Sequence, residues 1–173
     1  MFDLDLFRHL VVPPDNAPVA NDWSAVEARL GTGLPSDYKS LVDTYGLGSF
    51  GNFFHVFCPD AGSKRGLDLE YQHERTTWAL DYLAERGHTL PHPSADLLSC
   101  GRSDNGDVAY WITAGSDDPE QWRIGLGETR GHLWEEFDGG LGEWLAAVLS
   151  RRIRMKIFPK DFPRRTVRFT PIT

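Results

Sequence analysis

Three groups of acidic side chains are the residues of this chain best suited to chemistry or to the recognition of a cation. They comprise Asp104 and Asp107, then Asp117, Asp118 and Glu120, and finally Glu135, Glu136 and Asp138. Two carboxylates with different pKa values in one pocket perform acid–base hydrolysis. Carboxylates on a surface instead attract a basic protein partner and speed its association. Spacing along the chain does not decide between these interpretations, and solvated loop faces are a third.

The other reactive residue types give weaker signals. Two cysteines, Cys58 and Cys100, are too few for a disulfide scaffold, and their apolar neighbours predict buried free thiols in a reducing compartment. Cys58 precedes a proline and stays an alternative catalytic nucleophile. His88 and His92 are four residues apart, but the proline between them excludes a regular helix that would align them as metal ligands. The sequence therefore predicts no metal and no cofactor.

Residues 46–51 match the letters of a dinucleotide-binding loop, Gly-x-Gly-x-x-Gly. That fingerprint requires a strand before the glycines and a helix after them. Here the pattern predicts a helix that ends at Gly46 and a strand that begins near Phe53. Because this order is reversed, the glycines are interpreted as a helix end and a tight turn.

The formal net charge of −7 hides a strong asymmetry along the chain. Residues 151–173 carry eight basic residues and one acid, which leaves ten basic and 24 acidic residues, or −14, in the body before them. An acidic total argues against a general nucleic-acid binder. The basic segment is interpreted as a strap on the acidic body, and the alternative is an arm that binds nucleic acid or an anionic surface. Docking is favoured by the apolar residues between its charges: Phe158, Phe162, Val167, Phe169 and Ile172.

Four helices are expected from apolar residues at helical spacing. The first begins at a match to a capping box formed by Ser24 and Glu27. The third places Trp78, Tyr82 and Leu83 on one face. The predicted ranges are 24–30, 35–45, 69–86 and 141–152.

Short β-prone runs separated by turn residues predict an antiparallel meander in the middle of the chain. The strands are expected at 53–57, 97–101, 108–113, 122–125 and 132–137, with a further edge strand at 166–170. This order of elements predicts an α+β fold, with an antiparallel sheet of about four to six strands and helices packed on one face. We expect a single domain over 1–153 and a basic tail over 154–173 that docks on it.

Two segments resemble motifs of the SUKH (Smi/Knr-like) superfamily. Its opening motif is similar to residues 31–48, which read Gly-Thr-Gly-Leu-Pro-Ser-Asp-Tyr-Lys-Ser-Leu-Val-Asp-Thr-Tyr-Gly-Leu-Gly. Its central strand resembles residues 106–111, Gly-Asp-Val-Ala-Tyr-Trp, and its closing helix resembles the predicted helix that starts at Leu141. The matched positions are Leu34, Pro35, Tyr38, Leu41, Tyr45, Gly46, Gly48, Trp111 and Trp144.

The resemblance implies a SUKH-like α+β domain with no known catalytic centre. Bacterial members of that superfamily are immunity proteins that neutralise toxins, often nucleases, by direct binding. We therefore expect a non-catalytic, cytoplasmic protein-binding module, most simply an immunity protein that caps a basic toxin domain. The eight carboxylates of the three acidic groups are the expected contact surface, with no direct nucleic-acid or membrane partner.

Two alternatives stay open beside the immunity protein. One is a regulatory or scaffold protein of the same fold with a different partner. The other is a small hydrolase that uses the loop carboxylates or Cys58, and it requires those groups to converge in a pocket.

Overall fold

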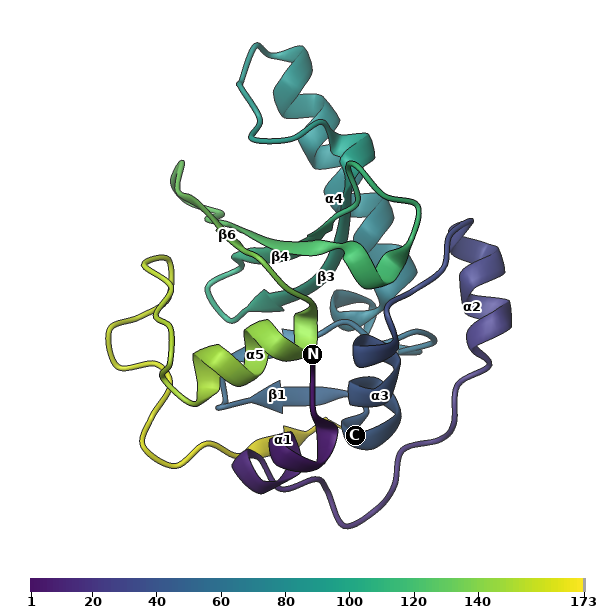
Figure 1. The fold of residues 1–173 in the computed structure, drawn as a ribbon. Helices are drawn as coiled ribbons and strands as arrows, with labels where there is room; N and C mark the ends of the chain where they lie inside the picture. The colour runs from purple at the N-terminus through teal and green to yellow at the C-terminus, as the bar shows by residue number, and fades with distance from the viewer. Residues whose placement is uncertain (173) are drawn as a thin grey trace.

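The computed structural model describes residues 1–172 (Figure 1). Its centre is a seven-stranded antiparallel sheet. Its strands are β1 (Gly48–Phe50), β2 (Phe54–Val56), β3 (Leu97–Ser103), β4 (Val108–Ile112), β5 (Arg123–Gly127), β6 (Trp134–Phe137) and β7 (Phe169–Pro171). The α-helices are α1 (Leu4–Leu10), α2 (Trp23–Leu30), α3 (Ser36–Tyr45), α4 (Leu69–Glu85) and α5 (Leu141–Leu149). The predicted α+β class with an antiparallel sheet is confirmed.

The strand order is β6-β5-β4-β3-β2-β1-β7. Strands β1 to β6 follow one another as a meander, and β7 returns from the end of the chain to pair with β1. The expected number of four to six strands is too low. The six predicted strands overlap β2 to β7, and the strand that they omit is β1. It has three residues, too few for an alternating pattern to distinguish it from loop.

Helices cover both faces of the sheet, which corrects the expectation that they pack on one face only. On one face, Ala109 and Trp111 of β4 join the core that α3 and α5 help to form. On the other face, Tyr110 and Ile112 pack with Leu80 of α4. Successive side chains of a strand point to opposite faces. The apolar run of β4 therefore contributes side chains to the hydrophobic layers on both faces of the sheet.

The start of α2 corrects the predicted capping box. Its N-cap is Asp22, whose carboxylate accepts a hydrogen bond from the N–H of Ala25 at 3.1 Å. Ser24 therefore lies inside the helix. The carboxylate of Glu27 accepts instead from the N–H of Leu34 at 2.8 Å, which ties α2 to the loop that leads into α3.

The aromatic residues of segment 31–48 build the core. Tyr38 is fully buried and donates its hydroxyl to the carbonyl oxygen of Phe57 at 2.8 Å. Tyr45 donates in the same way to Val11 at 2.6 Å. Each buried hydroxyl thus has the partner that makes its burial tolerable. The apolar positions Leu34, Leu41, Trp111 and Trp144 are at most 2% exposed.

The remaining motif positions shape the backbone around α3. Pro35 is the N-cap of this helix, and Gly46 ends it with a φ of 67°, a conformation that favours glycine. Gly48 lies against Phe169, and a Cβ atom there would lie 2.5 Å from the carbonyl oxygen of Thr170. These positions therefore serve the fold, including the approach of β7 to β1.

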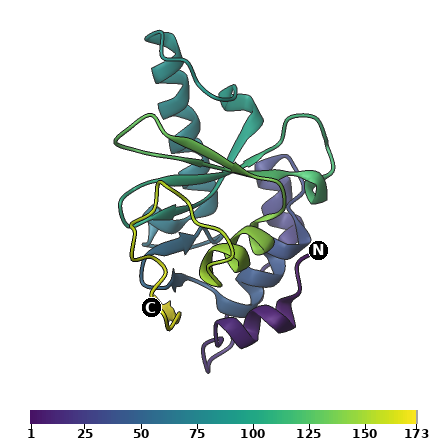
Figure 2. The same cartoon turned by 60° about the vertical axis from the view of Figure 1, so that its left-hand side comes forward.

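Residues 151–172 cross the body and end as the edge strand β7 (Figures 1 and 2). Phe158 is 4% exposed, and its ring centroid lies 5.4 Å from that of Phe53 and 6.0 Å from that of Trp144. Phe169 pairs with Phe50 across β7 and β1, with ring centroids 4.9 Å apart. The tail is therefore held by apolar packing and strand pairing.

Candidate functional site

The eight predicted carboxylates do not form one continuous surface. Asp107 is 4% exposed, which excludes it from a docking surface. Its carboxylate accepts hydrogen bonds from the hydroxyl of Ser103 at 2.7 Å and from the N–H of Thr129 at 3.2 Å. It thus stabilises the β3–β4 turn. Asp104 stays 55% exposed at the same turn and bonds Nε2 of His55 at 2.8 Å.

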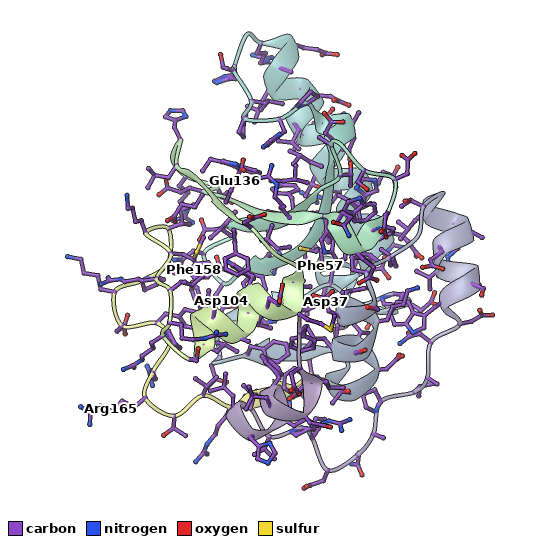
Figure 3. The ribbon with its side chains drawn as sticks, viewed as in Figure 1. Asp37, Phe57, Asp104, Glu136, Phe158 and Arg165 are labelled. Carbon is purple, nitrogen blue, oxygen red and sulfur yellow. The ribbon has the colours of Figure 1, made fainter. Side chains whose placement is uncertain are left out.

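The two carboxylates of β6 hold neighbouring segments together; one of them, Glu136, is labelled in Figure 3. Glu135 accepts a hydrogen bond from the N–H of Ile157 in the tail at 3.0 Å. Glu136 lies 2.7 Å from Nε2 of His92 and 2.9 Å from the Arg123 guanidinium, and the indole N–H of Trp134 also donates to it. The hydrogen bond from His92 is the main cause that lowers the pKa of Glu136. Both carboxylates are therefore engaged within the fold.

Glu120, from the group that also contains Asp117 and Asp118, lines a hollow of about 450 Å³ at the N-terminal ends of α3 and α5. Here Glu120 is joined by Asp37 and Glu143, which no sequence pattern marks as candidate contact residues. Asp117 and Asp118 are exposed in the same loop as Glu120, and Asp138 is exposed just before α5. We call Asp37, Asp117, Asp118, Glu120, Asp138 and Glu143 the acidic end.

Two carboxylates of the acidic end replace missing helix caps. The N-cap residues of α3 and α5, Pro35 and Gly140, supply no side-chain cap. Glu120 accepts hydrogen bonds from the N–H of Ser36 at 2.6 Å and from its hydroxyl at 2.9 Å. Asp37 accepts from the N–H of Gly142 at 2.7 Å. Both helices thus have orphan N–H groups satisfied by residues distant in sequence.

Burial raises the pKa of Asp37, and the charges of Glu120 and Glu143 add to this effect. A carboxyl group with a raised pKa beside other carboxylates has the composition of an acid–base pair. However, both oxygens of Asp37 accept backbone N–H bonds, one from Gly142 and one from Tyr38. The observed role of Asp37 is therefore to join α3 to α5.

We expect Asp37→Asn to cost about 1–3 kcal/mol of unfolding free energy, because the amide replaces one of two acceptors with a donor. The raised pKa means that wild-type Asp37 opposes folding more as the pH rises from the unfolded-state pKa of about 4 through the folded-state pKa. The cost of the substitution is therefore largest near pH 4 and smaller at pH 7. Urea unfolding at pH 4, 5, 6 and 7 measures this.

Asp117→Asn is the matched control for this experiment, because it removes an exposed carboxylate from the same acidic end. It should change the free energy of unfolding by less than about 0.5 kcal/mol at each pH. A cost of Asp37→Asn that grows with pH contradicts the raised pKa.

The thiols are buried and poorly placed for nucleophilic attack. Cys58 and Cys100 are free, as predicted. Burial raises the pKa of Cys58 to about 12, so its thiol stays protonated at neutral pH. Burial also raises the pKa of Cys100.

A second hollow, of about 920 Å³, is lined by residues of α2, α4, β3 and the β4–β5 loop. Its titratable side chains are His73, Asp96 and Asp117, and burial lowers the pKa of His73. Within residues 1–172, no three His, Cys, Asp or Glu side chains come together as metal ligands. Within the same range, no helix has the length and apolar character needed to cross a membrane.

Two aromatic rings form an exposed stack on α4. Trp78 is 68% exposed, Tyr82 is 42% exposed, and their rings stack with centroids 5.5 Å apart and planes at 18°. The guanidinium of Arg86 lies 4.5 Å from the centroid of Tyr82, in a cation–π contact. Leu83 is 38% exposed beside them. We call Trp78, Tyr82, Leu83 and Arg86 the α4 ladder.

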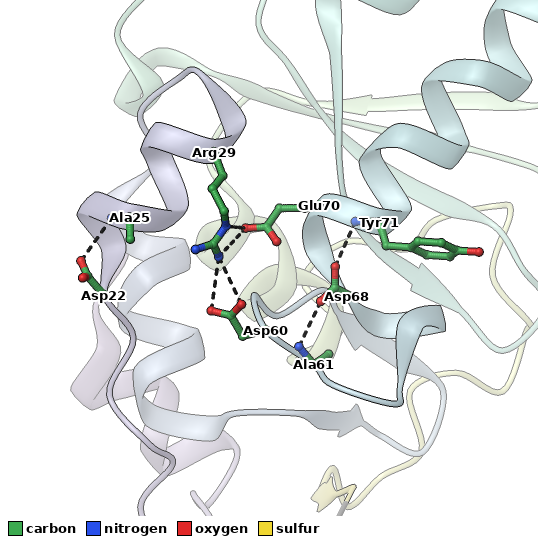
Figure 4. Close-up of polar contacts among 8 residues, drawn as sticks. All are labelled: Asp22, Ala25, Arg29, Asp60, Ala61, Asp68, Glu70 and Tyr71. Atoms are coloured by element: carbon green, nitrogen blue, oxygen red, sulfur yellow. Dashed lines mark hydrogen bonds and ion pairs between the residues drawn. The ribbon is translucent and has the colours of Figure 1, made fainter.

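The α4 ladder lies on the half of α4 that projects beyond the sheet in both views (Figures 1 and 2). The other end of α4 is anchored (Figure 4). Asp68 caps it by accepting from the N–H of Tyr71 at 2.9 Å. Arg29 of α2 bridges Glu70 at 2.7 Å and Asp60 at 3.2 Å. An anchored base thus presents the ladder on a rigid element.

Sequence periodicity places Trp78, Tyr82 and Leu83 on one helix face but does not show whether that face is packed. The face that packs is narrow and includes Leu80, which contacts the Tyr110 and Ile112 layer of the sheet. A surface helix usually has one apolar face, the one that packs on the core. Large apolar residues on a second face of the same helix are therefore the sequence signal that could have identified the α4 ladder as exposed.

Comparison with known proteins gives this geometry no external support. No family model, curated protein or solved structure matches the chain.

Proposed function

We propose that this chain is a non-catalytic protein-binding module whose central contact is the α4 ladder. The observation that carries the proposal is the exposed stack of Trp78 and Tyr82 on a projecting helix end. Exposed aromatic residues grouped on a surface mark protein interfaces, and Trp, Tyr and Arg are the residue types most enriched among interface hot spots. A ring already held in a stack also loses little conformational entropy when a partner covers it.

The charge distribution favours a basic partner. Residues 1–150 carry 24 acidic and ten basic residues, and Glu74, Asp81 and Glu85 are exposed around the α4 ladder. Such a rim of carboxylates steers a cationic partner toward the apolar centre. The exposed carboxylates Asp104, Asp117, Asp118 and Asp138 extend the same field over other surfaces.

The SUKH-like motifs give the proposal its specific form, an immunity protein that neutralises a basic toxin domain in the cytoplasm. Two buried free thiols accord with a reducing compartment. A regulatory or scaffold protein with another partner is the alternative form. The identity of the protein encoded beside this one distinguishes the two.

The test is calorimetric titration of this chain with the basic domain of the toxin encoded beside it. We expect a 1:1 complex with Kd below 1 µM, loss of the toxin's activity, and a Kd that rises with salt. A salt-independent Kd contradicts the electrostatic part. Absence of binding contradicts the immunity function.

A further inference from the structure

The cations of the tail face solvent, although the tail itself is part of the core. Met155, Ile157 and Phe158 are buried, and Phe162 and Phe169 are half-buried. Every basic side chain of residues 151–168 is exposed. We call these eight residues the basic strip: Arg151, Arg152, Arg154, Lys156, Lys160, Arg164, Arg165 and Arg168.

The charges of the basic strip are not neutralised by the acidic body. Within residues 1–172, none of the ion pairs involves a side chain of the strip. Arg151 donates to the carbonyl oxygen of Pro163 at 2.6 Å, and Arg152 donates to the hydroxyl of Ser150 at 3.2 Å. Arg165 points away from the ribbon into solvent (Figure 3). The tail therefore combines both predicted interpretations. Its apolar residues dock on the body like a strap, and its cations face outward like those of a binding arm.

We propose that the basic strip binds the phosphate backbone of double-helical nucleic acid. Six of its eight residues are arginines, whose planar guanidinium groups match phosphate oxygens. Packing of Phe158 and strand pairing of β7 hold the backbone in place. Binding therefore orders side chains but not a whole segment.

The arrangement of the apolar residues favours a duplex over two other anionic partners. A single strand is held by stacking of its bases on exposed aromatic rings, whereas in the tail Phe158 is buried and Phe162 and Phe169 are half-buried. An interfacial membrane segment inserts apolar side chains, and the large apolar side chains of residues 151–172 are all buried or half-buried. Phosphate contacts without base contacts are the mode that remains.

The acidic total charge does not oppose this binding at physiological salt. The Debye length there is about 8 Å, so exposed charges farther away are largely screened. The strip lies along a different side of the molecule from the α4 ladder (Figures 1 and 2). The expectation of no nucleic-acid partner rested on the average charge, which conceals this local surface.

The test is fluorescence anisotropy of labelled 20-bp DNA and RNA duplexes titrated with the full chain at several salt concentrations. We expect a Kd of about 1–100 µM near 150 mM salt, and log K that falls linearly with log salt. A single strand of equal charge and vesicles with anionic lipid are titrated in parallel, and both should bind more weakly. Tighter binding of either, or no duplex binding at 100 µM protein and 50 mM salt, overturns the proposal.

Arg164→Gln/Arg165→Gln/Arg168→Gln tests the surface itself. It should weaken duplex binding at least about tenfold and reduce the salt slope by up to about 3, because each lost phosphate contact lowers the slope by about 1. The control variant removes three exposed cations elsewhere, Lys64, Arg75 and Arg130, and has the same net charge. Equal weakening in both variants shows that only total charge matters and overturns the assignment.

Discussion

Replacing Phe158 with alanine is expected to cost about 3–5 kcal/mol of unfolding free energy. The ring is 4% exposed and contacts Phe53, Phe54, Trp144 and Phe162, with centroids between 5.4 and 6.0 Å away. Its loss leaves a cavity between α5 and the β1–β2 turn. Domains of this kind have total stabilities of about 5–15 kcal/mol. Urea unfolding of the variant and of the wild type measures the difference.

Removal of residues 154–173 should cost more than the single substitution, because it also deletes Met155 and Ile157 from the core and unpairs β7 from β1. The matched control is the Arg164→Gln/Arg165→Gln/Arg168→Gln variant, which should change stability by less than about 0.5 kcal/mol. A tail held by its charges would give the reverse pattern, with a large loss in the glutamine variant and stability that falls with salt. That result would contradict the apolar anchoring described here.

The sequence was sufficient to predict the elements whose signals are local. Pro35 and Gly46 bracket α3 because a proline fits a helix start and a positive φ fits a helix end. The meander from β3 to β6 also follows from short β-prone runs and turn residues. The fold class is accessible from such signals, since each depends on residues only a few positions apart.

Features that depend on distant residues could not be predicted. The caps of α3 and α5 come from Glu120 and Asp37, which are 84 and 105 positions from the backbone groups they bind. For the same reason Asp107 could not be distinguished from exposed carboxylates, since its burial depends on Thr129 folding back over the turn. The exposure of the α4 ladder could not be predicted either. Whether Trp78 packs or projects is decided by how far α4 extends beyond the sheet.

Truncation of the two stacked rings of the α4 ladder is expected to weaken binding of the basic partner strongly. Trp78→Ala/Tyr82→Ala should raise the Kd for the basic partner at least about 100-fold, since hot-spot residues each contribute 2 kcal/mol or more. Both side chains are exposed, so the double substitution should change the unfolding free energy by less than about 1 kcal/mol. Leu133→Ala, which truncates a 50% exposed side chain away from α4, is the control and should leave the Kd within about twofold.

The Trp78→Ala/Tyr82→Ala variant and the Arg164→Gln/Arg165→Gln/Arg168→Gln variant together show whether the two proposed surfaces bind independently. The α4 double variant should keep the duplex affinity of the wild type, because the basic strip is intact. The glutamine variant of the strip should keep the affinity for the protein partner. Loss of both activities in either variant would show that the surfaces are not independent.

The calorimetric Kd of Trp78→Ala/Tyr82→Ala against the basic partner, with its unfolding free energy measured on the same preparation, shows whether the α4 ladder is the contact surface. A Kd at least about 100-fold above that of the wild type, with stability retained, is the predicted result. A stable variant that binds within about twofold of the wild type would contradict the assignment of the α4 ladder as the contact surface.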